Sequence, residues 1–281
     1  MSAPVAIAQQ APEVAKQASG SSFYTAMRML PRAQREAMFD IYSFCRQVDD
    51  IADSDRPHPE RLEALKRWRA HLAALYAGSP PAHLRRLAAT VRAFHLGEDD
   101  FLALIEGMEM DATADIRAPD LATLDHYCDC VASAAGRLSV RIFGISTDEG
   151  IRLAHHLGRA LQFTNILRDI DEDATMGRLY LPRELLHGAG LAGAGLQDVL
   201  ASPALGQVCL PLIVRARAHF EDARRIMDRL PRRSVRAPRI MAGIYSLILE
   251  RLARRGWMAP RHQIHIPRWR ALAVVLRYAF W

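Results

Sequence analysis

Apolar residues recur every three or four positions along most of the chain, which is the spacing of one face of an α-helix. Stretches rich in proline or glycine, such as "RPHPE" and "GSPPAH", separate one such run from the next. Runs of alternating apolar and polar residues, which are typical of strands, do not occur. The pattern therefore predicts an all-α protein with helices over residues 32–54, 60–77, 82–95, 98–111, 121–145, 148–174, 204–229, 236–256 and 268–281.

The two ends of the chain differ from its middle. The first residues, "MSAPVAIAQQAPEVAKQ", lack both a basic segment followed by a long apolar one and any helical pattern, so we expect no signal peptide and a flexible arm over residues 1–18. Residues 19–266 read as one helical domain, and residues 267–281 read as an amphipathic C-terminal helix. No run of eighteen apolar residues occurs, so a membrane span is not expected.

The composition indicates the sign of charge expected of a partner and the cellular compartment of the protein. The formal net charge is +6, which favours an anionic partner, and the arginines are spread along the chain rather than gathered in one block. The four cysteines (Cys45, Cys128, Cys130 and Cys209) form no CxxC pair and no regular framework. Free thiols in a reducing cytoplasm are the state expected from that usage.

Acidic residues interrupt the apolar helix over residues 32–54. The stretch "RQVDDIAD" places Asp49 and Asp53 one turn apart on the same face, about 6 Å between their Cβ atoms, with Asp50 rotated away by about 100°. Arg46 lies three residues before Asp49 and four before Asp50, so it can pair with either. Like charges at this spacing weaken a helix unless a cation lies between them.

The same arrangement recurs more than a hundred residues later in "QFTNILRDIDED". Asn165, Asp169 and Asp173 follow one another at intervals of four, and Gln162 and Arg168 flank them. Two such acidic faces on opposite helices would form a cage of oxygen ligands. That cage suits Mg²⁺, which bridges carboxylates to a phosphorylated substrate, and the flanking arginines would contact the remaining phosphate oxygens.

The chain resembles the squalene/phytoene synthase family. The segments that carry the resemblance are, in order, "SSFYTAM", "YSFCRQVDDIAD", "YCDCVASAAG" and "QFTNILRDIDEDATMGRLYLP". Within the family, the chain is most similar to bacterial members that make presqualene diphosphate for hopanoid synthesis. The resemblance implies an isoprenoid synthase fold, in which a helical bundle surrounds a central cavity and the two aspartate motifs face each other across its mouth.

The resemblance also assigns roles to residues. It implies two or three Mg²⁺ ions and no NADPH. The implied metal ligands are Asp49, Asp53, Asn165, Asp169 and Asp173, and the implied catalytic residues are the four aspartates of that set together with Tyr127. The implied substrate-binding residues are Ser22, Phe23, Tyr42, Arg46, Gln162, Arg168, Tyr180 and Tyr245.

The implied reaction joins two molecules of farnesyl diphosphate head to head. Loss of diphosphate leaves an allylic cation, the second molecule attacks it, and loss of a proton closes the cyclopropane of presqualene diphosphate. The proton acceptor stays open between the released diphosphate and Tyr127. The cation requires a dry cavity, and we expect the small residues Val131, Ala132, Ala134, Ala135 and Gly136 to make room in it for the prenyl chains.

Other functions remain as alternatives. Within the family they are phytoene synthase, which uses two geranylgeranyl diphosphates, and squalene or dehydrosqualene synthase. From another class, a basic helical protein could bind nucleic acid or act in assembly, although no nucleic-acid-binding motif is present. Downstream enzymes of the pathway are candidate partners of a cytoplasmic synthase.

Two further stretches attract attention. His155 and His156 are adjacent, but no third ligand stands at a recognisable spacing, so we expect no transition-metal site there. The C-terminal segment combines Arg270 and Arg277 with Trp269 and other aromatic residues around a short apolar run. Such a helix either packs against the bundle or lies in the inner surface of the cell membrane as a peripheral contact.

Overall fold

A computed structural model describes Met27 and residues 29–114 and 116–279. Within that part the chain is helical, and the β-type pairing is limited to an isolated bridge between Arg117 and Leu179. The predicted all-α fold class is confirmed. The helices are α3 (Arg32–Ala52), α4 (His58–Tyr76), η1 (Ala82–Leu84), α5 (Arg85–Phe94), α6 (Glu98–Ala114), α7 (Leu121–Cys128), η2 (Asp129–Ser133), α8 (Ala134–Ile142), α9 (Asp148–Arg168), α10 (Ile170–Thr175), α11 (Arg183–Gly188), α12 (Leu196–Ala201), α13 (Leu205–Arg229), α14 (Arg236–Arg255) and α15 (Arg268–Ala279).

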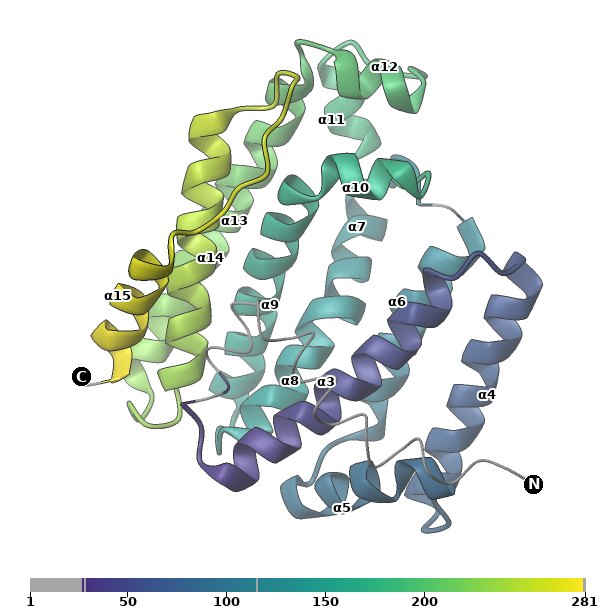
Figure 1. Ribbon diagram of the computed structural model, residues 1–281, viewed down its shortest axis with the longest axis vertical. Coiled ribbons are helices and arrows are strands. Elements are labelled where there is room, and N and C mark those ends of the chain that lie inside the picture. Colours follow the sequence, from purple (N-terminus) through teal and green to yellow (C-terminus); the bar gives the residue numbers. More distant parts are fainter. Residues whose placement is uncertain (1–26, 28, 115, 280–281) are drawn as a thin grey trace.

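Helix α9 lies at the centre of the bundle (Figure 1). Helices α13 and α14 pack on one side of it, α8 and the π-helical turn η2 pack on another, and α3, α4 and α6 form the neighbouring group. The sequence of α9 explains its position, because Leu153, Gly158 and Ile166 are buried on three different faces of the helix. Residues at the C-terminal end of such a central helix lie within reach of the surrounding helices.

The helix expected over residues 121–145 runs without a gap from Leu121 to Ile142, but a π-helical turn interrupts its regular spacing. It consists of α7, the wider turn η2 and α8, and it packs closely on α9 at η2 and α8. Glycines permit this approach: a Cβ on Gly158 would lie 2.9 Å from backbone atoms of Ala132 and Ser133, and one on Gly136 would lie 3.1 Å from Ala154. The position of α9 therefore depends on having no side chain at these two points.

The helix expected over residues 148–174 is also interrupted. Helix α9 ends at Arg168, Asp169 has φ −100° and ψ 13°, and α10 follows. The backbone bonds nevertheless continue at helical spacing, since the N–H of Asp169 donates to the carbonyl of Asn165 and the N–H of Asp173 donates to that of Asp169, both at 2.8 Å. The break bends the chain across the end of the bundle while Asp169 and Asp173 stay one turn apart.

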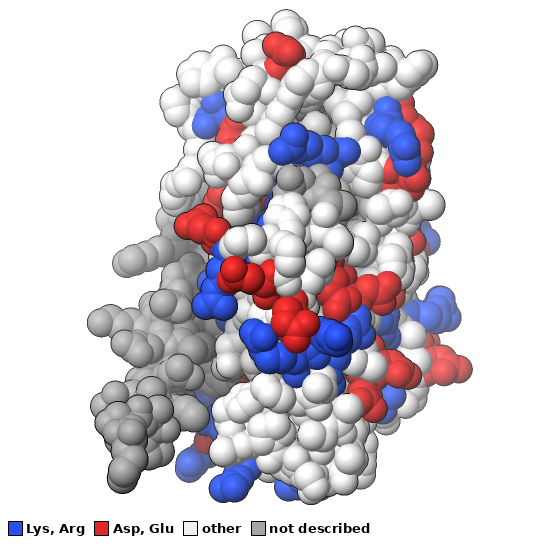
Figure 2. Space-filling model, turned by 90° about the vertical axis from the view of Figure 1, so that its right-hand side faces the viewer, with Lys and Arg blue, Asp and Glu red and all other residues white. Residues whose placement is uncertain are grey.

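The positive charge is not gathered into one surface on the face shown in Figure 2, where acidic and basic side chains are interspersed. Many arginines are paired with acids, for example Arg69 with Glu109 at 2.7 Å and Arg217 with Glu250 at 2.8 Å. This distribution agrees with the spread of arginine along the sequence. All four cysteines are free, as predicted, and none of the described helices has the length and apolarity needed to cross a bilayer.

The close contact at Gly158 yields a test of packing. We expect Gly158→Ala to lower the free energy of unfolding by about 1–3 kcal/mol, because the new methyl group would overlap backbone atoms of η2 that cannot move independently. Gly206→Ala in α13 is the matched control, since a Cβ there meets nothing within 4 Å and gains about 0.5–1 kcal/mol of helix propensity. Urea denaturation measures both, and equal effects would contradict the close-packing argument.

Candidate active site

The first acidic motif lies in the last turns of α3. Arg46 donates from Nη1 to Asp49 at 2.9 Å and from Nη2 to Asp50 at 2.8 Å, so it pairs with both acids. Val48 and Ala52 are buried on the core side of this turn and hold the helix against the bundle. The side chain of Asp50 is 64% exposed and that of Asp49 is 38% exposed, so the two neighbouring acids occupy different environments.

The second motif lies where α9 meets α10. Arg168 binds both carboxylate oxygens of Asp169, at 2.7 and 2.6 Å. The side-chain N–H of Asn165 donates weakly to Gln162 at 3.5 Å, whereas its buried side-chain oxygen Oδ1 has no hydrogen-bond partner. A buried acceptor without a donor is costly, and a cation or a ligand donor would satisfy it.

Arg178, which the sequence analysis did not single out, joins the two motifs. Its guanidinium donates to Asp53 at 2.6 Å and to the carbonyl of Ala52 at 3.1 Å, and its backbone N–H donates to the carbonyl of Asp173 at 3.0 Å. The Arg178 side chain is only 7% exposed. The end of α3 and the end of α10 are therefore held together by one buried cation.

Asp111 on α6 was also missed. It is buried, and it accepts hydrogen bonds from the hydroxyl of Tyr127 at 2.9 Å and from that of Tyr180 at 2.6 Å, while the two tyrosine rings stack 5.0 Å apart. The sequence feature that could have identified Asp111 is its place in the helical pattern, since it follows the buried Met108 by three residues and the buried Leu104 by seven. A carboxylate on the buried face of a helix requires partners, and these are two of the predicted site tyrosines.

The acids of the two motifs share one electrostatic field. Burial and then the charge of Asp53 raise the pKa of Asp49 to about 6. Burial and then the charge of Asp169 raise the pKa of Asp173 to about 7. The charge of Asp111 acts in the same direction on both, and burial raises the pKa of Asp111 itself. The structure thus brings the two predicted motifs to one place.

These observations fit a divalent cation. The raised pKa values show that the charged form of these carboxylates is disfavoured, and the side-chain oxygen of Asn165 is buried without a donor. Both are hard oxygen ligands that a nearby positive charge would stabilise. Arg46, Arg168 and Arg178 already supply part of that charge. The residues present that could hold Mg²⁺ are Asp49, Asp53, Asn165, Asp169 and Asp173.

The other predicted site residues are placed as follows. Tyr245 on α14 interacts with Arg168, and Tyr42 is half-buried on α3, whereas Ser22 and Phe23 lie outside the described residues. Of the small residues expected to make room for prenyl chains, Val131, Ala132 and Ala135 are half-buried. Ala134 is fully buried and Gly136 packs against Ala154 of α9, so both take part in helix packing.

Comparisons with known proteins agree with this geometry. The sequence profile described as squalene/phytoene synthase matches residues 16–270. A presqualene diphosphate synthase from Rhodopseudomonas palustris is 59% identical over 262 residues, which are 93% of this chain and 94% of that protein. A phytoene synthase from Zea mays is 36% identical over 72% of this chain and 49% of that protein. The crystal structure of squalene synthase HpnC from Alicyclobacillus acidocaldarius has a TM-score of 0.77 and 30% identity, covering 91% of this chain and 97% of that one.

Proposed function

The chain belongs to the squalene/phytoene synthase family, and from that premise we propose that it joins two molecules of farnesyl diphosphate head to head into presqualene diphosphate. The predicted family resemblance is confirmed. The observation that carries the proposal is the meeting of the two acidic motifs at Arg178, next to the buried group of Asp111, Tyr127 and Tyr180. Relatives of nearly the same length named presqualene diphosphate synthase support it over phytoene synthase, and the product would feed squalene and hopanoid synthesis.

The proposed role of the two motifs is to bind diphosphate through two or three Mg²⁺ ions. When bound, Mg²⁺ supplies positive charge that makes diphosphate a better leaving group. Asp49, Asp53, Asn165, Asp169 and Asp173 are the proposed ligands. Arg46 and Arg168 contribute from the two sides, because each is already held next to a motif carboxylate and can bind phosphate oxygens in bidentate fashion.

The hydrocarbon part of the substrates requires a dry surface. The half-buried side chains of Val131, Ala132 and Ala135 offer no polar atom that could hold water next to an allylic cation. We propose that the remaining substrate contacts come from Tyr42, Gln162, Tyr180 and Tyr245, and from Ser22 and Phe23, which lie outside the described residues. Exclusion of water by these groups would protect the cation until the second farnesyl chain attacks it.

The buried tyrosines offer a route for the proton that is lost when the cyclopropane closes. As the new carbon–carbon bond forms, the oxygen of Tyr127 accepts the proton from carbon and passes its own proton to Asp111 Oδ2, 2.9 Å away. Burial raises the pKa of Tyr127 well above its usual value, so the phenol stays protonated between turnovers. The step consumes no electrons, since one diphosphate and one proton leave, and therefore NADPH has no part in it.

The product assay tests the proposed function. Purified protein with Mg²⁺ should convert farnesyl diphosphate to presqualene diphosphate with and without NADPH, and should convert geranylgeranyl diphosphate far more slowly. Mass spectrometry of the extracted lipids identifies the products. Formation of phytoene, or of squalene only when NADPH is present, would instead assign the chain to one of the alternative synthases.

The same assay separates motif acids from their neighbours. Asp49→Asn and Asp169→Asn should lower turnover by about 10³-fold or more, since they remove electrostatic stabilisation of the leaving group. Asp50→Asn and Glu172→Gln are the matched controls, because both side chains lie beside motif aspartates but are exposed, and turnover should stay within a few-fold of the wild type. Comparable losses in all four variants would remove the metal-ligand assignment.

A further variant tests the proton route. Asp111→Asn keeps the size of the side chain and still accepts hydrogen bonds, but it cannot take up the proton, so kcat should fall about 10²–10⁴-fold with farnesyl diphosphate. Circular dichroism and thermal unfolding establish that the variant is folded. Near-normal kcat in the folded variant would show that the released diphosphate is the acceptor and not the Tyr127–Asp111 pair.

We also propose that α15 touches the membrane surface. Its exposed face carries Trp269, Leu272 and Leu276, which are 66%, 56% and 47% exposed, while Val275 is buried and Val274 lies against Gly243 of α14. One face therefore packs on the bundle and the other is apolar and open, as in interfacial helices. Each substrate molecule carries one C15 chain and the product carries two, and such chains partition into lipid, so a membrane contact would bring the enzyme close to them.

Liposome sedimentation tests this contact. Replacing Trp269, Leu272 and Leu276 by serine should reduce the fraction of protein that sediments with anionic liposomes at least several-fold, with catalysis of detergent-dispersed substrate retained. Ile151→Ser is the control, because Ile151 is 50% exposed on α9, outside the C-terminal helix. Unchanged sedimentation of the triple variant would exclude α15 as the contact.

A further inference from the structure

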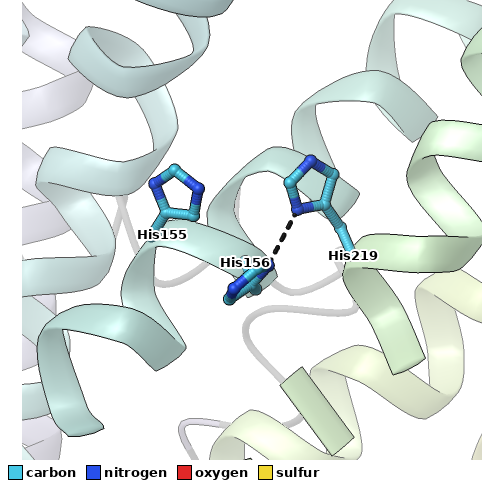
Figure 3. Close-up of side chains that lie close together, drawn as sticks. All are labelled: His155, His156 and His219. Atoms are coloured by element: carbon cyan, nitrogen blue, oxygen red, sulfur yellow. Dashed lines mark hydrogen bonds between the residues drawn. The ribbon is translucent and has the colours of Figure 1, made fainter. Parts of the chain in front are cut away.

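A second group of ligand-type side chains lies away from the aspartates. His155 and His156 on α9 meet His219 on α13, and Figure 3 shows the three imidazoles converging from the two helices. One ring nitrogen of each residue lies within 4.8 Å of those of the other two, and the Nδ1 atoms of His156 and His219 are 3.0 Å apart. The sequence spacing offered no third ligand to His155 and His156, and the fold brings a third imidazole to them from a residue more than sixty positions later.

The spacing approaches that of a metal site. Zinc binds imidazole nitrogen at about 2.0–2.1 Å in tetrahedral geometry, which puts two ligand nitrogens about 3.3 Å apart. The 3.0 Å separation of His156 and His219 is already close to that value. The ring nitrogen of His155 lies within 4.8 Å of both, so a change of its side-chain rotamer would have to bring it closer by up to about 1.5 Å. All three side chains are half-buried, so they are held in place yet reachable from solvent.

The protonation state also suits a metal. Burial lowers the pKa of all three histidines, that of His219 to about 4, so the imidazoles are neutral at physiological pH and have lone pairs to offer. In the metal-free state one of the two facing Nδ1 atoms of His156 and His219 carries a hydrogen and donates it to the other. For a metal to bind, that imidazole would shift its hydrogen from Nδ1 to Nε2 by exchange with water, so that both Nδ1 lone pairs face the ion.

The surrounding charges permit a cation. Asp222 Oδ2 lies 3.7 Å from His156 Nδ1 and offers an oxygen as fourth ligand. The nearby cation Arg159 is already neutralised, since it makes two bonds to Asp125 at 2.8 and 2.9 Å and one to Asp129 at 3.0 Å. After burial, Asp222 raises the pKa of His156 whereas Arg152 and Arg159 still lower it, so Asp222 is the group that would compensate the charge of a bound cation.

The other ligand-type cluster in the described residues is weaker. Glu106, His126 and Cys130 also lie within 4.8 Å of one another, but His126 is engaged with Glu106 at 2.8 Å and both are exposed. Burial raises the pKa of the Cys130 thiol to about 11, which disfavours the thiolate that binds metal. The histidine cluster is the better candidate.

We propose that His155, His156 and His219, with Asp222 as a fourth ligand, form a binding site for a first-row transition-metal dication of the Zn²⁺ class. Three imidazoles select such an ion over Mg²⁺, which prefers oxygen. Along α9 the site lies ten residues before Asn165, which is about 15 Å at the rise of an α-helix, so it is separate from the acidic motifs. A metal there would tie α9 to α13 and so hold the helix that ends at the second motif.

Metal titration tests the site. Chelator-treated protein in excess Mg²⁺, which occupies the acidic motifs, is titrated with Zn²⁺ by calorimetry in a His126→Ala background that removes the second cluster. We expect one tight equivalent and a rise in the unfolding temperature. His219→Ala should lower the affinity for Zn²⁺ by at least about tenfold and abolish the temperature rise. His265→Ala, at an exposed histidine elsewhere, should change neither.

Equal Zn²⁺ binding by His219→Ala would overturn the proposal and leave the three rings as an aromatic packing cluster. If that variant does not fold, the wild-type protein can still test the proposal. Histidine carbethoxylation mapped by peptide mass spectrometry should be blocked by Zn²⁺ at His155, His156 and His219 and not at His265. Equal modification with and without Zn²⁺ would refute the site. These readouts measure binding alone, so they do not depend on the proposed reaction.

Discussion

The structure is organised around the cost of placing several carboxylates at one end of a helical bundle. Two unit charges about 6 Å apart, as at Asp49 and Asp53, repel each other by about 3 kcal/mol at an effective dielectric constant of 20. Burial, and after it the charge of a neighbouring aspartate, raises the pKa of Asp49 and of Asp173. Arg46, Arg168 and Arg178 offset part of that cost, and the proposed divalent cations would neutralise the remainder.

The rest of the bundle keeps these acids in register. Helix α9 must approach η2 and α8 closely, which Gly136 and Gly158 allow, and it must carry Asn165 and Asp169 to the same end as α3. A buried cation does similar work further down: Arg159 reaches from α9 to Asp125 on α7 and to Asp129 in η2. Removing these two acids would leave the buried charge of Arg159 without a partner, which is costly.

The two clusters differ in the kind of ligand atom that they offer. Oxygen ligands at the end of the bundle suit Mg²⁺ and diphosphate, while the imidazoles between α9 and α13 suit a softer ion about 15 Å away along the same helix. Both clusters include residues of α9: Asn165 near its C-terminal end, and His155 and His156 where it packs against α13. The exposed face of α15 is a third kind of surface, apolar and directed away from α14.

The sequence by itself determined the helical fold class, the two acidic motifs and the family, because helical periodicity and the spacing of four between ligands are local properties of the chain. It also located Arg46 correctly, since its partners Asp49 and Asp50 lie within one turn. Only the tertiary structure decided that Arg178 bridges the motifs, that Asp111 receives both tyrosine hydroxyls and that His219 completes a triad with His155 and His156. These contacts join residues on separate elements, and no local pattern encodes which distant side chain a fold will bring within 3 Å.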